Sequence, residues 1–93
     1  MKRHLLRSST FVRAAKRFLE KQPKAEGAFQ KALILLEEDA FHHKLRTHKL
    51  KGKLRGSWAC SAGYDLRIVF DIVQHAGSEA ILLLTVGTHE EVY

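Results

Sequence analysis

Hydrophobic and polar positions alternate over residues 64–70. Alternate side chains of a β-strand point to opposite faces of its sheet. One face of this predicted strand is apolar and consists of Tyr64, Leu66, Ile68 and Phe70. The other face consists of Asp65, Arg67 and Val69. A strand with one core face and fixed charges on the other indicates either a structural ion pair or the floor of a site.

Two amphipathic helices are predicted before this strand. In the first, apolar residues recur at the spacing of one helical face, namely Phe11, Ala14, Ala15, Phe18 and Leu19. Hydroxyl side chains at residues 8–10 can cap its start. Pro23 cannot continue this helix and suits the beginning of the next one, predicted from about residue 24 to 39.

The second helix has a wide apolar surface. Its core stripe comprises Ala25, Ala28, Phe29, Ala32, Leu33 and Leu36. Ile34 and Leu35 lie beside the stripe and widen it. They either pack on the first helix or form a groove for a partner protein.

Four strand-like segments complete the pattern. Residues 2–7 suit a charged edge strand, and residues 57–61 suit a short strand with Trp58 and Cys60 on one face. The central strand extends to Val73, a turn is predicted at residues 75–78, and residues 81–86 return as an apolar strand. We therefore predict an α+β fold of order β-α-α-β-β-β, with two helices packed on one face of a small, mainly antiparallel sheet. Residues 1–93 are expected to form one domain.

The positive charge is concentrated in one segment. The chain has 16 Lys and Arg against 10 Asp and Glu, a formal charge of +6. No acidic residue occurs between His42 and Arg55, whereas this segment contains Lys44, Arg46, Lys49, Lys51, Lys53 and Arg55. Such a segment attracts a polyanion, with nucleic acid as the first candidate, or is simply a solvated loop.

Targeting signals and cysteine chemistry are not evident. The longest apolar run, residues 80–86, is far shorter than the roughly 20 residues that span a bilayer. Because the first residues do not resemble a signal peptide, we expect a cytoplasmic protein with no membrane partner. The single Cys60 lies in an apolar context, which favours a half-buried, unreactive thiol over a nucleophile.

Histidines supply candidate proton carriers. His48 lies in the basic segment and His89 follows the last predicted strand. Together with Arg67, these side chains suffice for RNA phosphodiester transfer, which needs a base, an acid and a cation on the phosphate. The histidine and cysteine spacing does not favour zinc, and this chemistry requires no metal. Trp58 and Tyr93 either stack on bases or pack within the protein.

Three motifs resemble a known family. They are His48-Lys49-Leu50-Lys51-Gly52, the strand beginning Tyr64-Asp65-Leu66-Arg67, and the ending Gly87-Thr88-His89-Glu90-Glu91-Val92-Tyr93. These motifs resemble the RelE/ParE toxin superfamily, and most closely its YafQ-like branch. The resemblance implies a type II toxin that cleaves messenger RNA on the ribosome, uses no cofactor and is neutralised by a cognate antitoxin protein.

The resemblance also implies roles for particular residues. His48, Asp65 and His89 match family proton carriers or their partners, Arg67 matches an arginine that contacts the scissile phosphate, and Tyr93 matches a terminal aromatic residue. Ser61 stands where the branch has a second histidine, and Leu66 stands where it has an aromatic residue. The first difference leaves open which residue is base and which is acid.

Two other functions remain open at this stage. A ParE-like toxin of the same fold would inhibit DNA gyrase by contact, without cleavage chemistry. An inactive toxin homologue would act with its antitoxin in DNA-bound regulation. The histidines with Arg67 favour the nuclease, because a binding protein has no need of proton carriers.

Overall fold

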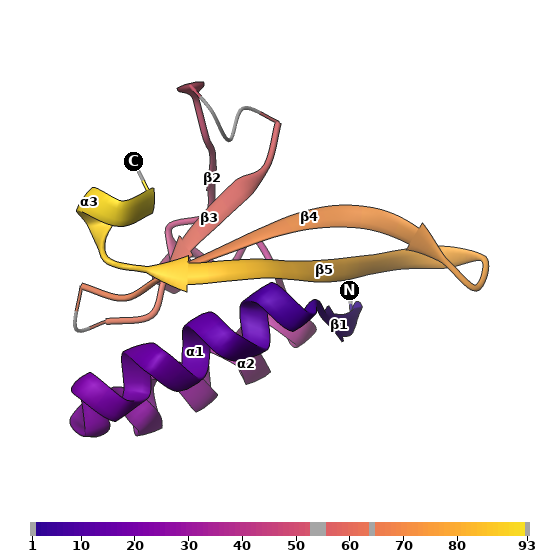
Figure 1. Ribbon diagram of the computed structural model, residues 1–93. Coiled ribbons are helices and arrows are strands. Elements are labelled where there is room, and N and C mark those ends of the chain that lie inside the picture. The colour runs from indigo at the N-terminus through magenta and orange to yellow at the C-terminus, as the bar shows by residue number, and fades with distance from the viewer. Residues whose placement is uncertain (1, 53–55, 64, 93) are drawn as a thin grey trace.

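A five-stranded sheet with two helices on one face forms the structure, a computed structural model (Figure 1). It describes residues 2–52, 56–63 and 65–92. In sequence order, the elements are β1 (His4–Arg7), α1 (Ser9–Lys21), α2 (Glu26–Glu38), β2 (His48–Lys49), β3 (Trp58–Ser61), β4 (Arg67–His75), β5 (Ser78–Gly87) and α3 (His89–Val92). Short 3-10 helices at Pro23–Ala25 and His43–Leu45 lie before α2 and before β2.

The strand order in the sheet is β1-β5-β4-β3-β2. Every neighbouring pair is antiparallel except β1 and β5, which are parallel. The β4–β5 hairpin turns at Ala76 and Gly77, where both residues have positive φ angles of 51° and 85°. That geometry fits a tight two-residue hairpin connection. The predicted α+β class, the mainly antiparallel sheet and the charged edge strand are all confirmed.

Local sequence signals account for α1. The Ser8 hydroxyl accepts a hydrogen bond from the Phe11 backbone N–H at 3.0 Å, which caps the helix start. Phe11 and Ala15 are buried, as the apolar spacing predicted. The cations of the predicted outer face are exposed, namely Arg13, Lys16, Arg17 and Lys21.

The sheet has an apolar cluster on each side. The larger cluster lies between the sheet and the helices and includes Leu66, Ile68 and Phe70. A smaller cluster on the open face consists of Leu50, Ala59, Val69 and Val92, with Leu84 packed against it. The predicted alternation of Ile68 and Phe70 against Val69 is therefore confirmed. α3 covers part of the open face through Val92.

The central strand begins later than predicted. β4 starts at Arg67, and the preceding chain makes a turn in which the Leu66 N–H donates to the Gly63 carbonyl oxygen at 2.6 Å. Asp65 has a left-handed φ of 59°, which aspartate tolerates better than most residues. The prediction that Asp65 shares a strand face with Arg67 is wrong, because this turn interrupts the alternation. Tyr64 lies outside the described residues.

Several other predicted boundaries need correction. The order β-α-α-β-β-β omitted β2 and α3, because two- and four-residue elements are too short for a periodic signal. The first strand spans His4–Arg7 rather than residues 2–7, and the second helix divides into the 3-10 turn Pro23–Ala25 and α2. Ile34 is 59% exposed, whereas Leu35 packs against the core.

Cys60 is more deeply buried than predicted. Its side chain has no exposed surface and belongs to the helix-side core. Burial raises the pKa of the Cys60 thiol to about 12, and the Ile68 backbone hydrogen bond and the charge of Arg67 only partly oppose this rise. The thiol is therefore protonated at neutral pH, as an unreactive cysteine should be.

Among the helices in the part of the chain that the structure describes, none is long and apolar enough to cross a bilayer.

Candidate active site on the open face of the sheet

Residues from four separate segments line one hollow of about 180 Å³ on the sheet. The lining consists of Arg46, His48, Ser61, Arg67 and His89. Three of these residues, His48, Arg67 and His89, are the proton carriers and the cation predicted from the sequence. The fold thus brings together side chains that lie far apart in the chain.

Arg67 forms the floor of the hollow. As the first residue of β4, it pairs with Ser61 of β3 on one side and with Gly87 of β5 on the other. Its side chain is half-buried, and its Nη1 donates to the Leu66 carbonyl oxygen at 3.2 Å. Strands on both sides fix the backbone, so the guanidinium charge is held at a defined place. A half-buried cation interacts more strongly with a phosphate than an exposed one, because water screens it less.

His48 is oriented by the backbone. β2 carries it beside Ala59 of β3, and its Nδ1 lies 2.9 Å from the Arg46 carbonyl oxygen. A carbonyl oxygen can only accept, so Nδ1 must carry the proton in this hydrogen bond. In the neutral ring, the lone pair is then on Nε2, the nitrogen that can take up a proton. Arg46 reaches this position through a left-handed φ of 52°.

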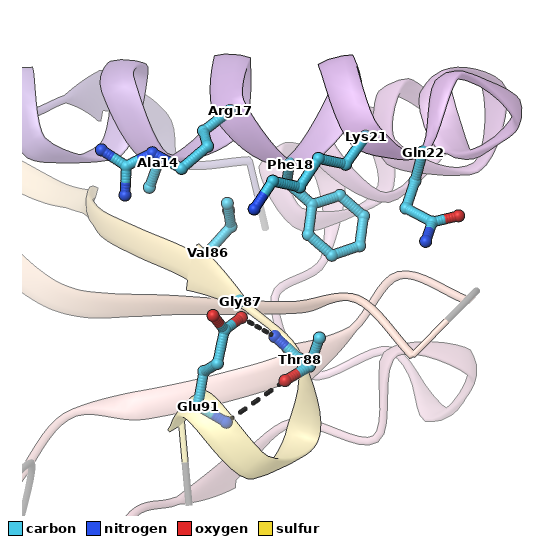
Figure 2. A pocket seen from close by; sticks show the side chains of 9 residues that line it. All are labelled: Ala14, Arg17, Phe18, Lys21, Gln22, Val86, Gly87, Thr88 and Glu91. Carbon is cyan, nitrogen blue, oxygen red and sulfur yellow. Dashed lines mark hydrogen bonds between the residues drawn. The ribbon is translucent and has the colours of Figure 1, made fainter.

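His89 is placed by a capping box at the start of α3. The Thr88 Oγ1 accepts from the Glu91 N–H at 3.3 Å, and the Glu91 carboxylate accepts from the Thr88 N–H at 2.8 Å (Figure 2). His89 is the first residue of the helix that these bonds define. This capping box was not predicted, although the Thr-x-x-Glu spacing is its usual signature.

The Asp65 side chain binds the backbone of His89. Its Oδ1 accepts a hydrogen bond from the His89 backbone N–H at 3.2 Å. The Asp65 carboxylate is exposed and does not line the hollow. The ion pair with Arg67, one of the two expectations for the strand, is not formed between these two described residues, because the turn at Asp65 separates them.

The basic segment is described in part. Lys44, Arg46, Lys49 and Lys51 are exposed, and Lys49 and Lys51 border a depression beside His48. Trp58 is half-buried and packs against the core, which is one of its two predicted roles. Lys53, Arg55 and Tyr93, which were also predicted site residues, lie outside the described residues.

A second hollow, of about 240 Å³, lies on the other side of the β5–α3 junction, against α1 (Figure 2). Arg17, Phe18 and Lys21 of α1 point towards it, and Gly87 and Thr88 border it from below. Among the described residues, none of those predicted from the sequence as site residues lines it. Within the described residues, no group of three or more His, Cys, Asp or Glu side chains is arranged to hold a metal ion.

Solved structures of small toxins share this fold. YafQ from Escherichia coli strain BL21(DE3) is 15% identical with a TM-score of 0.76, and the match covers 99% of each chain. The E. coli DinJ–YafQ toxin–antitoxin complex matches at 16% identity with a TM-score of 0.75, over 100% of this chain and 99% of that one. A YoeB/ParE toxin from Agrobacterium tumefaciens matches at 12% identity with a TM-score of 0.71, over 92% and 98% of the two chains. These likenesses define the fold class, which is that of the RelE/ParE toxins.

The sequence itself identifies the family. Residues 3–93 match the model of the bacterial toxin of type II toxin–antitoxin systems, YafQ. No curated protein matches the sequence. Because the family model covers nearly the whole chain, this protein belongs to the YafQ family of type II toxins.

Proposed function

We propose that this toxin is an endoribonuclease that cuts messenger RNA on the ribosome, without a metal, by attack of a ribose 2′-hydroxyl. The observation that carries this proposal is the convergence of His48, Arg67 and His89 on one hollow. Two proton carriers and a cation around one space are what phosphodiester transfer requires. In the reaction, the 2′-oxygen bonds to phosphorus and the bond from phosphorus to the 5′-oxygen breaks, leaving a 2′,3′-cyclic phosphate and a 5′-hydroxyl.

His48 is the better candidate for the general base. The Arg46 carbonyl oxygen accepts from Nδ1, which puts the lone pair of the neutral ring on Nε2, and in the proposed reaction this nitrogen takes the 2′-hydroxyl proton. His89 is then the acid that protonates the leaving 5′-oxygen. Arg67 stabilises the negative charge that builds on the phosphoryl oxygens, and Asp65 positions His89 through its backbone.

Ser61 lies within the same hollow as the histidines. Its hydroxyl can donate a hydrogen bond to a phosphate oxygen, but it cannot transfer a proton near neutral pH as histidine does. This supports a mechanism with two histidines, in which the residue at the position of the family's second histidine has a binding role.

Family membership supports a proposal for the biological setting. A type II toxin is paired with a protein antitoxin, and the E. coli relative is known as a complex with DinJ. We propose that a cognate antitoxin neutralises this toxin, that residues 1–93 act as one domain, and that the protein works in the cytoplasm, where ribosomes translate. The exposed cations Lys44, Arg46, Lys49 and Lys51, together with Lys53 and Arg55, would hold the RNA.

The test is primer extension on messenger RNA after brief induction of the toxin. The parent should produce discrete new 5′ ends. His48→Ala and His89→Ala should each reduce cleavage by about 10²- to 10⁴-fold, the usual contribution of acid–base catalysis. His75→Ala is the matched control, because His75 is exposed at the end of the β4–β5 hairpin, and it should cleave like the parent.

Other outcomes point to other functions. Undiminished cleavage by His89→Ala would remove this residue from the mechanism. A parent that stops growth without producing new 5′ ends would instead favour contact inhibition, as in a ParE-like toxin. A parent that binds its antitoxin but neither cleaves nor stops growth would favour an inactive homologue.

A further inference from the structure

Two adjacent aromatic rings with a cation at each end form a row near the β2 edge of the sheet. The Arg3 Cζ lies 5.8 Å from the centre of the Phe41 ring, the Phe41 and Trp58 rings meet edge to face at 5.0 Å, and the Lys49 Nζ lies 5.3 Å from the Trp58 ring centre. We call Arg3, Phe41, Trp58 and Lys49 the cation–aromatic row. None of these residues lines the hollow of the candidate active site.

Part of the row is exposed to solvent, although its rings are large and apolar. Phe41 is 46% exposed, one of three large hydrophobic side chains among the described residues that are exposed to this degree. Trp58 is half-buried and Lys49 is exposed. Trp58 packs against the core, which explains why its ring is partly buried. Core packing does not explain why Phe41 leaves a large part of its ring in solvent.

Strand alternation places the row and the candidate active site on opposite faces of the sheet, at the same edge strand, β2. His48 pairs with Ala59, which belongs to the open-face cluster, so both side chains lie on the open face, where His48 lines the hollow. The next pair, Lys49 and Trp58, points to the opposite face of the sheet. Because β2 is the edge strand among the described residues, no described strand separates the two surfaces. An extended chain that leaves the hollow can therefore pass over β2 and reach the row.

We propose that the cation–aromatic row is a second RNA-binding surface, on which Phe41 and Trp58 stack with unpaired bases. This inference rests on the proposed RNA-directed function. Aromatic rings bind bases of any sequence through their faces, and neighbouring cations hold the phosphates. In the free protein, Lys49 covers the Trp58 ring. A base takes its place on the ring, and the flexible ammonium moves to a phosphate of the same strand.

The aromatic rings, together with the surrounding positive charge, favour RNA over an acidic protein segment. Residues 42–55, which supply Lys49 and continue from Phe41, contain no acidic residue. Arg3 is held by an ion pair with Glu79 at 3.0 Å, and the Asp39 carboxylate accepts from the Phe41 backbone N–H. Lys49 is exposed and provides a positive charge beside the Trp58 ring, and the segment that supplies it also carries the exposed cations Lys44 and Lys51. A row of flat rings along a cationic edge suits a single-stranded polyanion with planar groups.

Binding at the row can be followed by the fluorescence of Trp58, because the sequence contains one Trp. The probe is a ten-nucleotide 2′-O-methyl uridine oligonucleotide, which lacks the attacking hydroxyl and cannot be cut by the proposed reaction. We expect it to quench the fluorescence of the full chain, with an affinity that falls as salt rises. Phe41→Ala should weaken binding by about 10-fold or more, the usual effect of removing one stacking ring.

Two variants make this result specific. Phe41→Leu keeps apolar bulk but has no ring face, and it should bind as weakly as Phe41→Ala. Ile34→Ala removes a side chain of α2 that is 59% exposed and is not part of the row, and it should bind like the parent. Unchanged oligonucleotide affinity in Phe41→Ala would overturn the proposal. If that variant instead lost affinity for the antitoxin alone, the surface would belong to a protein partner, which overturns it equally.

Ribosome binding separates the two sources of RNA. If Phe41→Ala weakens binding to ribosomes with and without message, the row contacts ribosomal RNA. If it weakens binding only to ribosomes that carry message, the row contacts messenger RNA, and both results support the proposal. The uncleavable probe makes the outcome independent of catalysis. Intact oligonucleotide binding without new 5′ ends would refute the nuclease function but not this surface.

Discussion

At the scale of single residues, hydrogen bonds to the backbone hold the candidate site. The Arg46 carbonyl oxygen selects the tautomer of His48, and the Asp65 carboxylate holds the backbone of His89. Side chains that are held before substrate binds need less reordering in the transition state. The two histidines are therefore fixed by different means, although both line the same hollow.

Asp65 tests the distinction between a positioning residue and a base. Asp65→Asn keeps an oxygen that can accept from the His89 N–H, and asparagine also tolerates the left-handed φ of 59°. We expect this variant to retain cleavage within about 10-fold, because a general base would contribute about 10²- to 10⁴-fold. Single-turnover cleavage of ribosome-bound message measures the rate.

Asp65→Ala is the comparison, since it removes the acceptor and also strains the turn. It should cleave more slowly than Asp65→Asn. If the asparagine variant instead loses about 10³-fold, as a missing base would require, then Asp65 takes the proton itself and His48 is not the general base.

At the scale of elements, the junction of β5 and α3 decides where His89 lies. A Cβ atom on Gly87 would come within 3.0 Å of the Glu91 Oε1 and 3.1 Å of the Glu91 Cβ. Those contacts are tighter than ordinary packing, so α3 lies close to the strand only because residue 87 has no side chain. The same glutamate completes the capping box (Figure 2).

Gly87→Ala should therefore move α3 and slow cleavage. Overpacking of this kind costs about 1–3 kcal/mol, and a displacement of about 1 Å at a catalytic group can cost about 100-fold in rate. Urea unfolding and the cleavage assay measure the two effects.

Gly27→Ala is the matched control for this substitution. Gly27 lies in the first turn of α2, and a Cβ there would meet nothing within 4 Å. Alanine at this position should raise the free energy of unfolding by about 0.4–1 kcal/mol and leave cleavage unchanged. A Gly87→Ala variant that matched this control in both assays would show that a Cβ atom at residue 87 does not displace α3.

At the scale of the whole molecule, the buried Cys60 links global stability to pH. Its folded pKa is about 12, raised by burial from an ordinary 9.0. Between these values the unfolded chain loses the thiol proton while the folded chain keeps it, so deprotonation favours unfolding. Stability from this group is complete below pH 9.0 and is lost as pH rises towards 12.

We expect the free energy of unfolding of the parent to fall, relative to Cys60→Ala, by about 1.4 kcal/mol per pH unit above pH 9. Urea titrations at pH 8, 9 and 10 would measure this difference. The alanine variant should be less stable at pH 8, because it leaves a cavity in the core. Parallel pH profiles for the two proteins would contradict the burial of this thiol.

Much of the fold was predictable because its signals are local. A helical apolar stripe, a serine before it and an alternating strand each act over a few residues, and α1, Ile68 and Phe70 confirm them. The turn at Asp65 was missed because alternation alone cannot distinguish a strand from a turn that also buries Leu66. β2 was missed because two residues carry no period.

By itself, the sequence determined the fold class, the basic segment, the histidine motifs and the family. Only the tertiary structure decided that His48, Arg67 and His89 meet at one hollow, that Asp65 holds a backbone N–H, and that Phe41 lies against Trp58. The physical reason is the sequence distance over which each signal acts. Periodicity and capping are set by neighbouring residues in the chain, whereas these contacts between distant residues depend on the order in which the five described strands pair.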